Sequence, residues 1–198
     1  MKAREVVSFD FGWRTRLGLH APPDPNKLWP LPDNTGPGLN PAEAQQDFDD
    51  SSWERVRLPH DGLVAEGPSN VTCPSGCSGR SYIPQSVMWY RKSFALPEDW
   101  LLTRNQTSMW IEFDGIFRAT IVYLNGDIIV QNAQGYLGFE VPLSKVTKGT
   151  NILGVYVFMH LSEPRVFLIY MFVLSCSIIC RSRYWRRNIQ YTAFWLVV

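Results

Sequence analysis

The chain has 198 residues, which suits one domain with an appendage and is enough for a full-sized core. Its 19 Lys and Arg residues against 18 Asp and Glu residues give a net charge of +1. No basic field is present to hold a phosphate backbone, so a nucleic-acid partner is not expected. The 14 Gly, 14 Pro and 14% aromatic residues are typical of a turn-rich β protein.

The first half of the chain predicts short strands separated by two irregular loops. An apolar cluster from Val6 to Trp13 predicts a first strand, and Glu54–Leu58 predicts a short one. Residues 21–41 lie between them, and they contain too many prolines for a strand ladder. We therefore expect surface loops at 21–41 and at 62–84.

The middle of the chain predicts a series of strands with period-2 alternation. In Thr107–Asp114 the side chains of Met109, Ile111 and Phe113 share one face. Asn125-Gly126 is a strong signal for a two-residue hairpin turn. The expected strands are Val87–Leu96, Thr107–Asp114, Phe117–Leu124, Asp127–Gln131 and Asn151–Val157. Short strands at this spacing predict an all-β sandwich.

The four cysteines form two C-x3-C pairs, Cys73/Cys77 and Cys176/Cys180. This spacing matches no usual zinc site and no histidine lies near either pair, so no metal and no cofactor are expected. Free thiols and a local Cys73–Cys77 disulfide both remain open. The first residues lack the apolar segment of a secretory signal, which predicts a cytoplasmic protein by default, or a secreted one if the natural chain starts upstream.

Five motifs occur in the order of a known family. They are FDFGW (Phe9–Trp13), FDDSSWERVRLPHD (Phe48–Asp61), WYRKSFALPEDW (Trp89–Trp100), FDGIFRATIVYLNG (Phe113–Gly126) and GYLGFEVPLSKVTKGTNILGVYV (Gly135–Val157). Residues 1–157 resemble the N-terminal sugar-binding domain of glycoside hydrolase family 2, the β-galactosidase-like enzymes. The resemblance implies a jelly-roll, galactose-binding-like β-sandwich. It also implies that Phe113–Gly126 is the central hairpin of a scaffold and carries no catalytic residue.

The resemblance implies a glycosidase of carbohydrate metabolism whose catalytic residues lie elsewhere. A retaining enzyme uses two carboxylates about 5 Å apart. In the family these are glutamates of a downstream (β/α)8 barrel, which needs about 250 residues. We therefore expect this chain to be inactive alone, and to hydrolyse O-glycosyl bonds of β-galactoside-like carbohydrates only when joined to immunoglobulin-like and barrel domains. The alternative is a stand-alone carbohydrate-binding module, with or without a membrane tether.

Three residues are candidates for the edge of a sugar pocket. Asn70 lies in SNVT, which resembles an Asn-bearing loop of the larger β-galactosidases, although N-V-T is also a glycosylation sequon. His60 and Asp61 lie in LPHD, which matches the family's LPHDW except that Gly62 replaces the Trp. Both residues are alternatively hydrogen-bonders that fix a loop.

Two further features bear on sugar binding. The family's pocket Asp is expected within residues 132–136, where this chain has no Asp, so the substrate class is open. Trp89, Tyr90 and Trp110 are candidates for stacking on a sugar, but their places on expected strands favour packing within the protein.

The tail, residues 158–198, departs from the family pattern, which continues with a Gly-rich turn ending in G-I-Y-R and a closing strand. Val166–Cys180 is a run of 15 apolar or small residues followed by arginines, which is short for a membrane span of about 20 residues. Tyr184–Gln190 can be encoded by codons that, read one base later, encode T-G-G-G-I-Y, a sequence close to the family's Gly-rich turn. This is compatible with a retained intron that is followed by coding sequence in the wrong frame. Retained intron, membrane anchor and native apolar closing segment all remain open, and we favour the first.

We expect this tail to be irregular or helical. A sandwich without its closing strand exposes a strand edge and part of its core. The sequence therefore predicts that residues 1–157 lack a cooperative fold and that the tail does not restore one.

Overall fold

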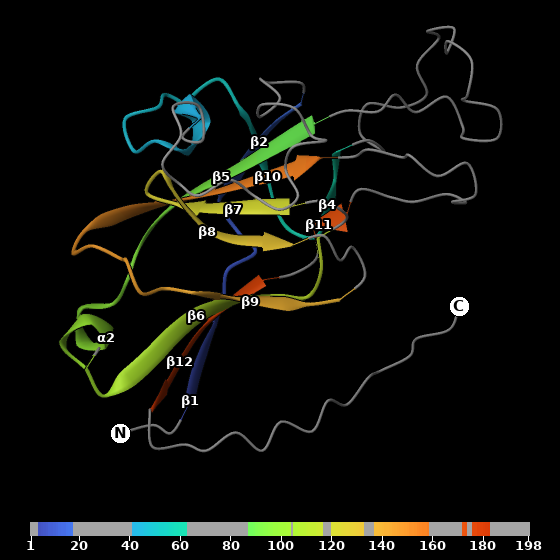
Figure 1. Ribbon diagram of the computed structural model, residues 1–198. Coiled ribbons are helices and arrows are strands. Elements are labelled where there is room, and N and C mark those ends of the chain that lie inside the picture. Colours follow the sequence, from blue (N-terminus) through green and yellow to red (C-terminus); the bar gives the residue numbers. More distant parts are fainter. Residues whose placement is uncertain are drawn as a thin grey trace, which may run out of the picture.

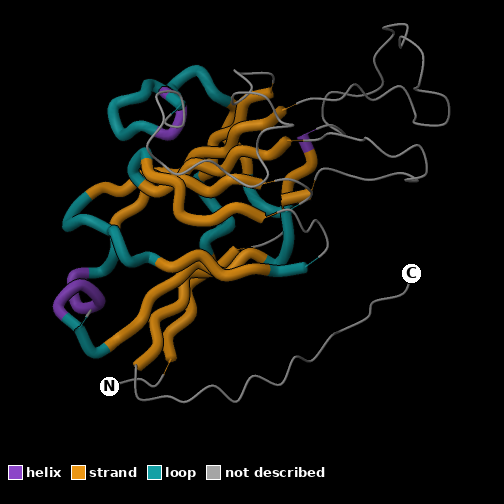
Figure 2. Tube along the Cα trace, viewed as in Figure 1, coloured by secondary structure: helices purple, strands orange, loops and turns teal. Residues whose placement is uncertain are grey.

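The computed structural model describes residues 4–17, 41–62, 87–103, 105–116, 120–132, 137–158, 172–173 and 176–182 of the chain. Antiparallel strands dominate these residues. Figure 1 shows them as two layers, with a six-stranded sheet above a four-stranded one, and Figure 2 follows the strands and the loops that join them. The all-β sandwich expected from the sequence is confirmed.

The strand orders are β1-β12-β6-β9 in one sheet and β3-β2-β5-β10-β7-β8 in the other, and β11 pairs with β4 in a separate ribbon. The expected strands of the middle region are all present. The strands are β1 (Arg4–Ser8), β2 (Trp13–Leu17), β3 (Glu54–Val56), β4 (His60–Asp61), β5 (Val87–Ala95), β6 (Thr107–Phe113), β7 (Thr120–Leu124), β8 (Asp127–Asn132), β9 (Phe139–Pro142), β10 (Thr150–Phe158), β11 (Phe172–Val173) and β12 (Cys176–Ser182). Two short helices, η2 (Ala42–Ala44) and α2 (Glu98–Leu102), complete the described elements.

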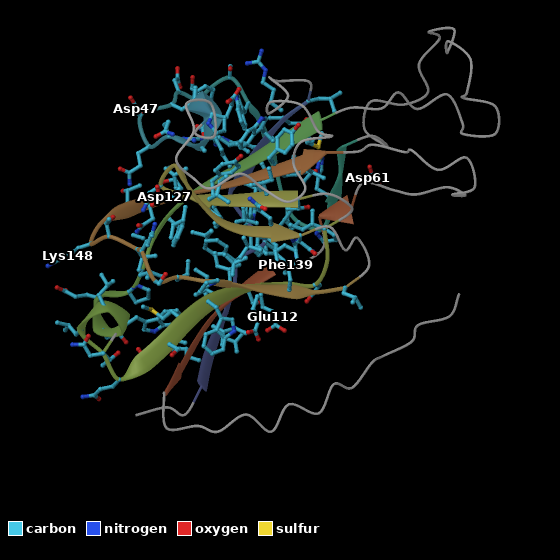
Figure 3. All side chains as sticks on the ribbon, viewed as in Figure 1. Asp47, Asp61, Glu112, Asp127, Phe139 and Lys148 are labelled. Carbon is cyan, nitrogen blue, oxygen red and sulfur yellow. The ribbon has the colours of Figure 1, made fainter. Side chains whose placement is uncertain are left out.

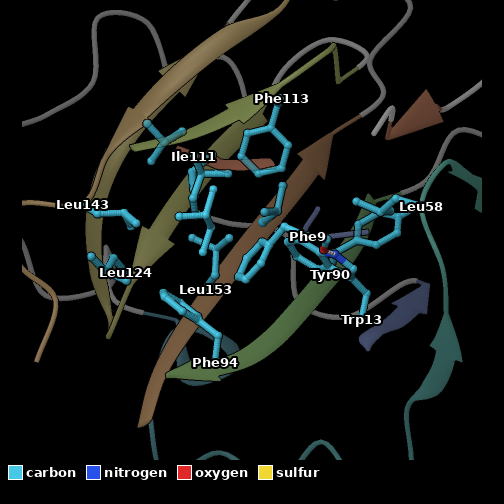
Figure 4. Packing of buried hydrophobic residues seen from close by; sticks show 14 of the residues in the cluster. Phe9, Trp13, Leu58, Tyr90, Phe94, Ile111, Phe113, Leu124, Leu143 and Leu153 are labelled. Atoms are coloured by element: carbon cyan, nitrogen blue, oxygen red, sulfur yellow. Dashed lines mark hydrogen bonds between the residues drawn. The ribbon is translucent and has the colours of Figure 1, made fainter. Parts of the chain in front are cut away.

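The main core lies between the two sheets and follows from the alternation in the sequence. On β6, Ile111 and Phe113 are fully buried, whereas Glu112 on the opposite face is only half-buried. Figure 4 shows these core side chains meeting residues of the other layer, among them Leu153 of β10 and Trp13 of β2. Burying a large apolar side chain contributes roughly 1.5–3 kcal/mol, so this core is the main source of stability.

A second apolar cluster covers the outer face of the six-stranded sheet. Trp89 of β5, Tyr123 of β7 and Tyr156 of β10 pack together there, with ring centroids 5.1–5.5 Å apart in the two contacts made by Trp89. Trp53, from the segment that carries η2, completes the cluster. Trp89 is fully buried, so it packs within the protein and presents no surface to a sugar.

The hairpin turn at Asn125-Gly126 is confirmed. Both residues have positive φ angles, 52° and 93°, as a turn that matches the twist of the flanking strands β7 and β8 requires. However, the expected hairpin over Phe113–Gly126 is wrong. β6 belongs to the four-stranded sheet and β7 to the six-stranded one, so the chain crosses between layers after Phe113. Two adjacent alternating runs do not specify whether they pair or separate.

The single first strand expected from Val6 to Trp13 is also divided. β1 pairs with β12 in one sheet and β2 pairs with β3 and β5 in the other. The chain changes direction before Trp13 at Gly12, which adopts a φ of 73°. A glycine tolerates this left-handed backbone without strain.

Residues 172–173 and 176–182, the described part of the tail's apolar run and the residues after it, form strands and not the expected irregular or helical structure. β12 lies between β1 and β6, and it pairs with all seven positions of β6. Ile178 and Cys180 of β12 are buried in the main core. The tail thus supplies a strand to the four-stranded sheet, and the expectation of a sandwich that lacks this strand is wrong.

Several predictions fall outside the residues that the structure describes. These are Asn70, the Cys73/Cys77 pair, and the loops at 21–41 and 62–84 apart from their terminal residues Pro41 and Gly62. The boundary between a 1–157 domain and a 158–198 tail stays a prediction. Within the described ranges, no helix is long and apolar enough to span a membrane.

Candidate functional site

The LPHD motif forms a fixed corner at one end of the sandwich. Leu58 is buried in the main core, and its backbone N–H donates a hydrogen bond to the Asp10 carbonyl at 2.9 Å. The next residues form β4, in which His60 pairs with Val173 and Asp61 pairs with Phe172 of β11. Figure 3 shows Asp61 at this end of the molecule, beside the β4–β11 ribbon.

His60 is held by a tyrosine of the neighbouring layer. Its Nδ1 lies 3.0 Å from the hydroxyl of Tyr90, and the two rings meet edge to face with centroids 5.7 Å apart. Tyr90 is fully buried in the main core, whereas His60 is half-buried. His60 therefore contacts the core through Tyr90, and the rest of its ring is partly exposed at the end of the sandwich.

The electrostatics keep this pair uncharged near neutral pH. Burial lowers the pKa of His60, against the opposing influence of Glu54 and Asp61, whose negative charges favour the imidazolium. Burial also raises the pKa of Tyr90, and the Asp61 charge adds to that rise. A neutral imidazole that is half-buried can orient a polar ligand by hydrogen bonds.

The structure brings two of the three expected site residues together. His60 and Asp61 are adjacent on β4, and the Asp61 charge acts on both His60 and Tyr90. Asn70 lies outside the described residues. Sequence reasoning missed Tyr90 as a partner of His60, because a contact across 30 residues depends on how β4 folds against β5.

The position where the family has a Trp is occupied differently here. A Cβ built on Gly62 would lie 1.9 Å from the Cε of Met88, so the methionine side chain fills the space beside residue 62. Met88 is itself buried in the main core. The replacement of the family's Trp by Gly62 is thus accompanied by a core residue of β5 that takes up the room.

The acidic residues Asp49, Asp50 and Glu98 have structural roles. Asp50 forms ion pairs with Arg14 and Arg91, and Asp49 accepts a hydrogen bond from the Ser51 backbone N–H at 2.9 Å. Glu98 forms an exposed ion pair with Lys148 at 3.6 Å. Among the described residues, no group of three or more His, Cys, Asp or Glu side chains is placed to hold a metal ion.

A family model described as "Glycosyl hydrolases family 2, sugar binding domain" matches residues 68–176, which is more than half of the chain. This chain belongs to the family of glycoside hydrolase family 2 sugar-binding domains. The match extends past residue 157, to the first residue of β12.

Curated relatives agree with the family 2 assignment, and a solved structure shares the fold. The β-galactosidase BoGH2A of Bacteroides ovatus is 34% identical over 156 residues, which cover 78% of this chain and 15% of that protein. A β-glucuronidase of Formosa agariphila is 29% identical over 121 residues, covering 60% of this chain and 12% of that protein. A β-glycosidase of Bacteroides vulgatus superposes with a TM-score of 0.66 at 22% identity, over 89% of this chain and 20% of that one, and so shares its fold.

The chain is much shorter than the proteins it resembles. It spans between 11% and 16% of the length of the curated relatives that it matches. Most of each relative therefore has no counterpart in this sequence.

Proposed function

We propose that this chain is the non-catalytic N-terminal domain of a β-glycosidase, and that it forms one wall of the sugar pocket through the His60–Asp61 corner. Hydrolysis of the O-glycosyl bond is carried out by glutamates of a barrel domain that must be joined to it. The observation that carries this proposal is the family 2 sugar-binding match on a chain that spans no more than 16% of its curated relatives.

The substrate class follows from the relatives. They are named as β-galactosidases and β-glucuronidases, so we infer that the substrate is a β-glycoside of a hexose or a hexuronic acid. The neutral His60 fits this role because a sugar hydroxyl both donates and accepts hydrogen bonds. Asn70 completes the same wall in this proposal.

The experiment is a domain exchange. This chain replaces the matching segment of the Bacteroides ovatus β-galactosidase, and release of nitrophenol from aryl β-galactoside and aryl β-glucuronide is measured. We expect no release by the chain alone, measurable release by the chimera, and none by the same enzyme with the segment deleted. Release by the isolated chain, or a chimera no better than the deletion, contradicts the proposal.

The role of the corner is tested in the same chimera. His60→Ala is expected to raise KM with little change in kcat, because it removes a ligand contact that is remote from the bond broken. Lys145→Gln is the matched control, since Lys145 is exposed and pairs only with the exposed Asp127 in the described part of the chain. If His60→Ala and Lys145→Gln have the same KM, His60 does not contribute to the sugar pocket.

A stand-alone carbohydrate-binding module is the competing outcome. It predicts that the isolated chain binds immobilised glycans tightly and that the chimera gains nothing from the chain. Glycan-array binding by the isolated chain separates the two functions.

A further inference from the structure

Asn125 and Gly126, which form the turn between β7 and β8, carry a reactive pair of groups. No other asparagine of the chain is followed by a glycine. A glycine has no side chain to shield its backbone nitrogen, which can attack Cγ of the preceding asparagine. The new C–N bond closes a succinimide ring, the Cγ–Nδ2 bond breaks, and ammonia leaves with the proton of the attacking N–H. Water then opens the ring at either carbonyl and gives aspartate or isoaspartate.

The folded domain holds the Asn125 side chain at both ends of its amide. Its Oδ1 accepts hydrogen bonds from the Ile152 backbone N–H at 2.8 Å and from Nε2 of Gln46 at 2.9 Å. Its Nδ2 donates a hydrogen bond to Oδ1 of Asn151 at 2.9 Å. Asn151 and Ile152 belong to β10, and Gln46 follows η2. The amide is therefore tied to two elements outside its own turn.

Backbone groups fix the orientation of this amide. The Ile152 N–H can only donate, so the atom that faces it is the Asn125 oxygen. Asn151 is oriented in the same way, because its Oδ1 accepts from the Thr147 N–H at 2.8 Å and its Nδ2 donates to the Thr147 carbonyl at 3.1 Å. Oδ1 of Asn151 is thus an acceptor, and the group that it meets on Asn125 is the donor Nδ2.

The backbone of the turn is also unsuited to ring closure. Positive φ angles at both Asn125 and Gly126 are those of a type I′ turn. The succinimide ring requires the peptide between them to rotate until the Gly126 nitrogen eclipses Cβ of Asn125, an arrangement that a type I′ turn does not provide. Gly126 is itself buried, and a Cβ built on it would lie 2.7 Å from Oε1 of Gln45. The Gln45 side chain thus lies against the residue that must turn.

We propose that Asn125 is a deamidation site that the fold keeps closed, with Gln46 and Asn151 as the residues that hold its amide. The reaction then proceeds only from molecules in which this turn has opened. Its product cannot restore the original contacts, because a carboxylate at position 125 has no N–H and sets an oxygen against Oδ1 of Asn151. Deamidation therefore records an opening of the turn as a lasting negative charge. The inference depends on the hydrogen bonds of the hairpin and is independent of the proposed function.

The rate of deamidation in the full chain tests the closed state. The chain is incubated at mildly alkaline pH, folded or unfolded in urea, and mass spectrometry follows the mass gain of the peptide that contains Asn125. An opening that costs about 1.4 kcal/mol slows a reaction of the open state about tenfold. We expect the folded chain to react more than about tenfold more slowly than the unfolded chain. A smaller difference overturns the proposal.

Gln46→Ala tests the hydrogen bonds at an exposed residue. It is expected to speed deamidation of the folded chain by about threefold to tenfold, as the loss of one hydrogen bond would, while Tm changes little. Gln106→Ala is the matched control, because Gln106 is also exposed and lies in the turn before β6. Equal rates for these two variants contradict the proposal. Asn151→Ala is expected to react faster than Gln46→Ala, and Gln46→Ala still decides the matter if Asn151→Ala unfolds.

Asn125→Asp carries the carboxylate of the product and tests its effect on the fold. Asn105→Asp makes the same chemical change at an exposed position of the turn before β6 and is the matched control. We expect Tm of Asn125→Asp to lie about 2–4 °C below that of Asn105→Asp, the shift that the loss of one hydrogen bond causes in a chain of this size. Equal Tm values would show that the product fits the closed turn, which contradicts a lasting record of its opening.

Discussion

Arg91 fastens the segment around η2 to the outer face of the six-stranded sheet. Its guanidinium donates to the Gln45 carbonyl at 2.9 Å, to the Phe48 carbonyl at 3.2 Å and to the Asp50 carboxylate at 3.0 Å, and it also donates to the Glu43 carbonyl. The Arg91 side chain is only 2% exposed. We expect Arg91→Met to destabilise the domain strongly, because it keeps the volume and removes every one of these donors.

The magnitude follows from what is left behind. Removing one partner of a buried ion pair costs about 3–5 kcal/mol. The lower end applies here, because Asp50 is 23% exposed and keeps Arg14 at 3.4 Å. A loss of about 3 kcal/mol is a large part of a typical stability of about 5–15 kcal/mol. For a chain of this size it lowers Tm by about 6–12 °C.

The assay is urea unfolding followed by tryptophan fluorescence, with amide hydrogen exchange of residues 43–53 as a local readout. Lys145→Met is the matched control, because the Lys145–Asp127 pair is exposed by 61% and 53% and such pairs contribute about 0–1 kcal/mol. Arg91→Lys should recover less than half of the loss, since a lysine cannot reproduce the planar fork of donors. If Arg91→Met lies within 1 kcal/mol of the control, the reasoning is refuted.

Two further predictions concern buried polar groups. Asn151 is fully buried, and its side-chain amide forms hydrogen bonds with Thr147, Gly149 and Asn125. Asn151→Ala should therefore lower the free energy of unfolding, measured in urea, by about 2–3 kcal/mol. A loss below about 0.5 kcal/mol would contradict this role. Burial holds the pKa of His60 in the folded chain below its ordinary 6.5, despite the charges of Glu54 and Asp61. As pH falls, His60 of the unfolded chain therefore takes up a proton before His60 of the folded chain does. The stability that neutral His60 contributes is lost as pH falls through 6.5 toward the folded pKa. Tm measured from about pH 7.5 to about pH 5 should therefore fall less in His60→Gln than in the unaltered chain, and parallel curves would exclude His60 as the cause.

Most of the strands were predicted correctly because side-chain alternation and turn residues are signals that a short stretch of sequence carries. The alternation around Ile111 and the positive-φ turn at Asn125-Gly126 depend on neighbours within a few residues. The division of Val6–Trp13 between two sheets, and the crossing of the chain after Phe113, depend on which distant strand each run meets. Alternation fixes which side chains share a face and leaves the partner strand undetermined.

The candidate site shows the same limit. LPHD pointed to His60 and Asp61 by motif, and both lie at one corner of the sandwich. Tyr90 was named from the sequence only as an aromatic residue of an expected strand, and its contact with His60 was not predicted. That contact depends on how β4 folds against β5, which is not readable from one sequence.

In the tail the structure differs most from the expectation drawn from the sequence, and a single residue of β12 tests how this strand is packed. Ile178 is 5% exposed, lies opposite Ile111 of β6 and Val7 of β1, and belongs to the main core. Because β12 is part of the sheet, Ile178→Ala removes buried methyl groups and leaves a cavity, which costs about 2–4 kcal/mol. Urea unfolding of the full chain measures the loss.

Ser177→Ala provides the matched control, because Ser177 is the adjacent residue of the same strand and faces away from the core, opposite Glu112. A change at this partly exposed position outside the core is expected to stay within about 0.5 kcal/mol. A large loss for Ile178→Ala with none for Ser177→Ala shows the alternation of a strand that is packed in the sandwich. Equal and negligible losses would contradict the packing of Ile178 in the main core.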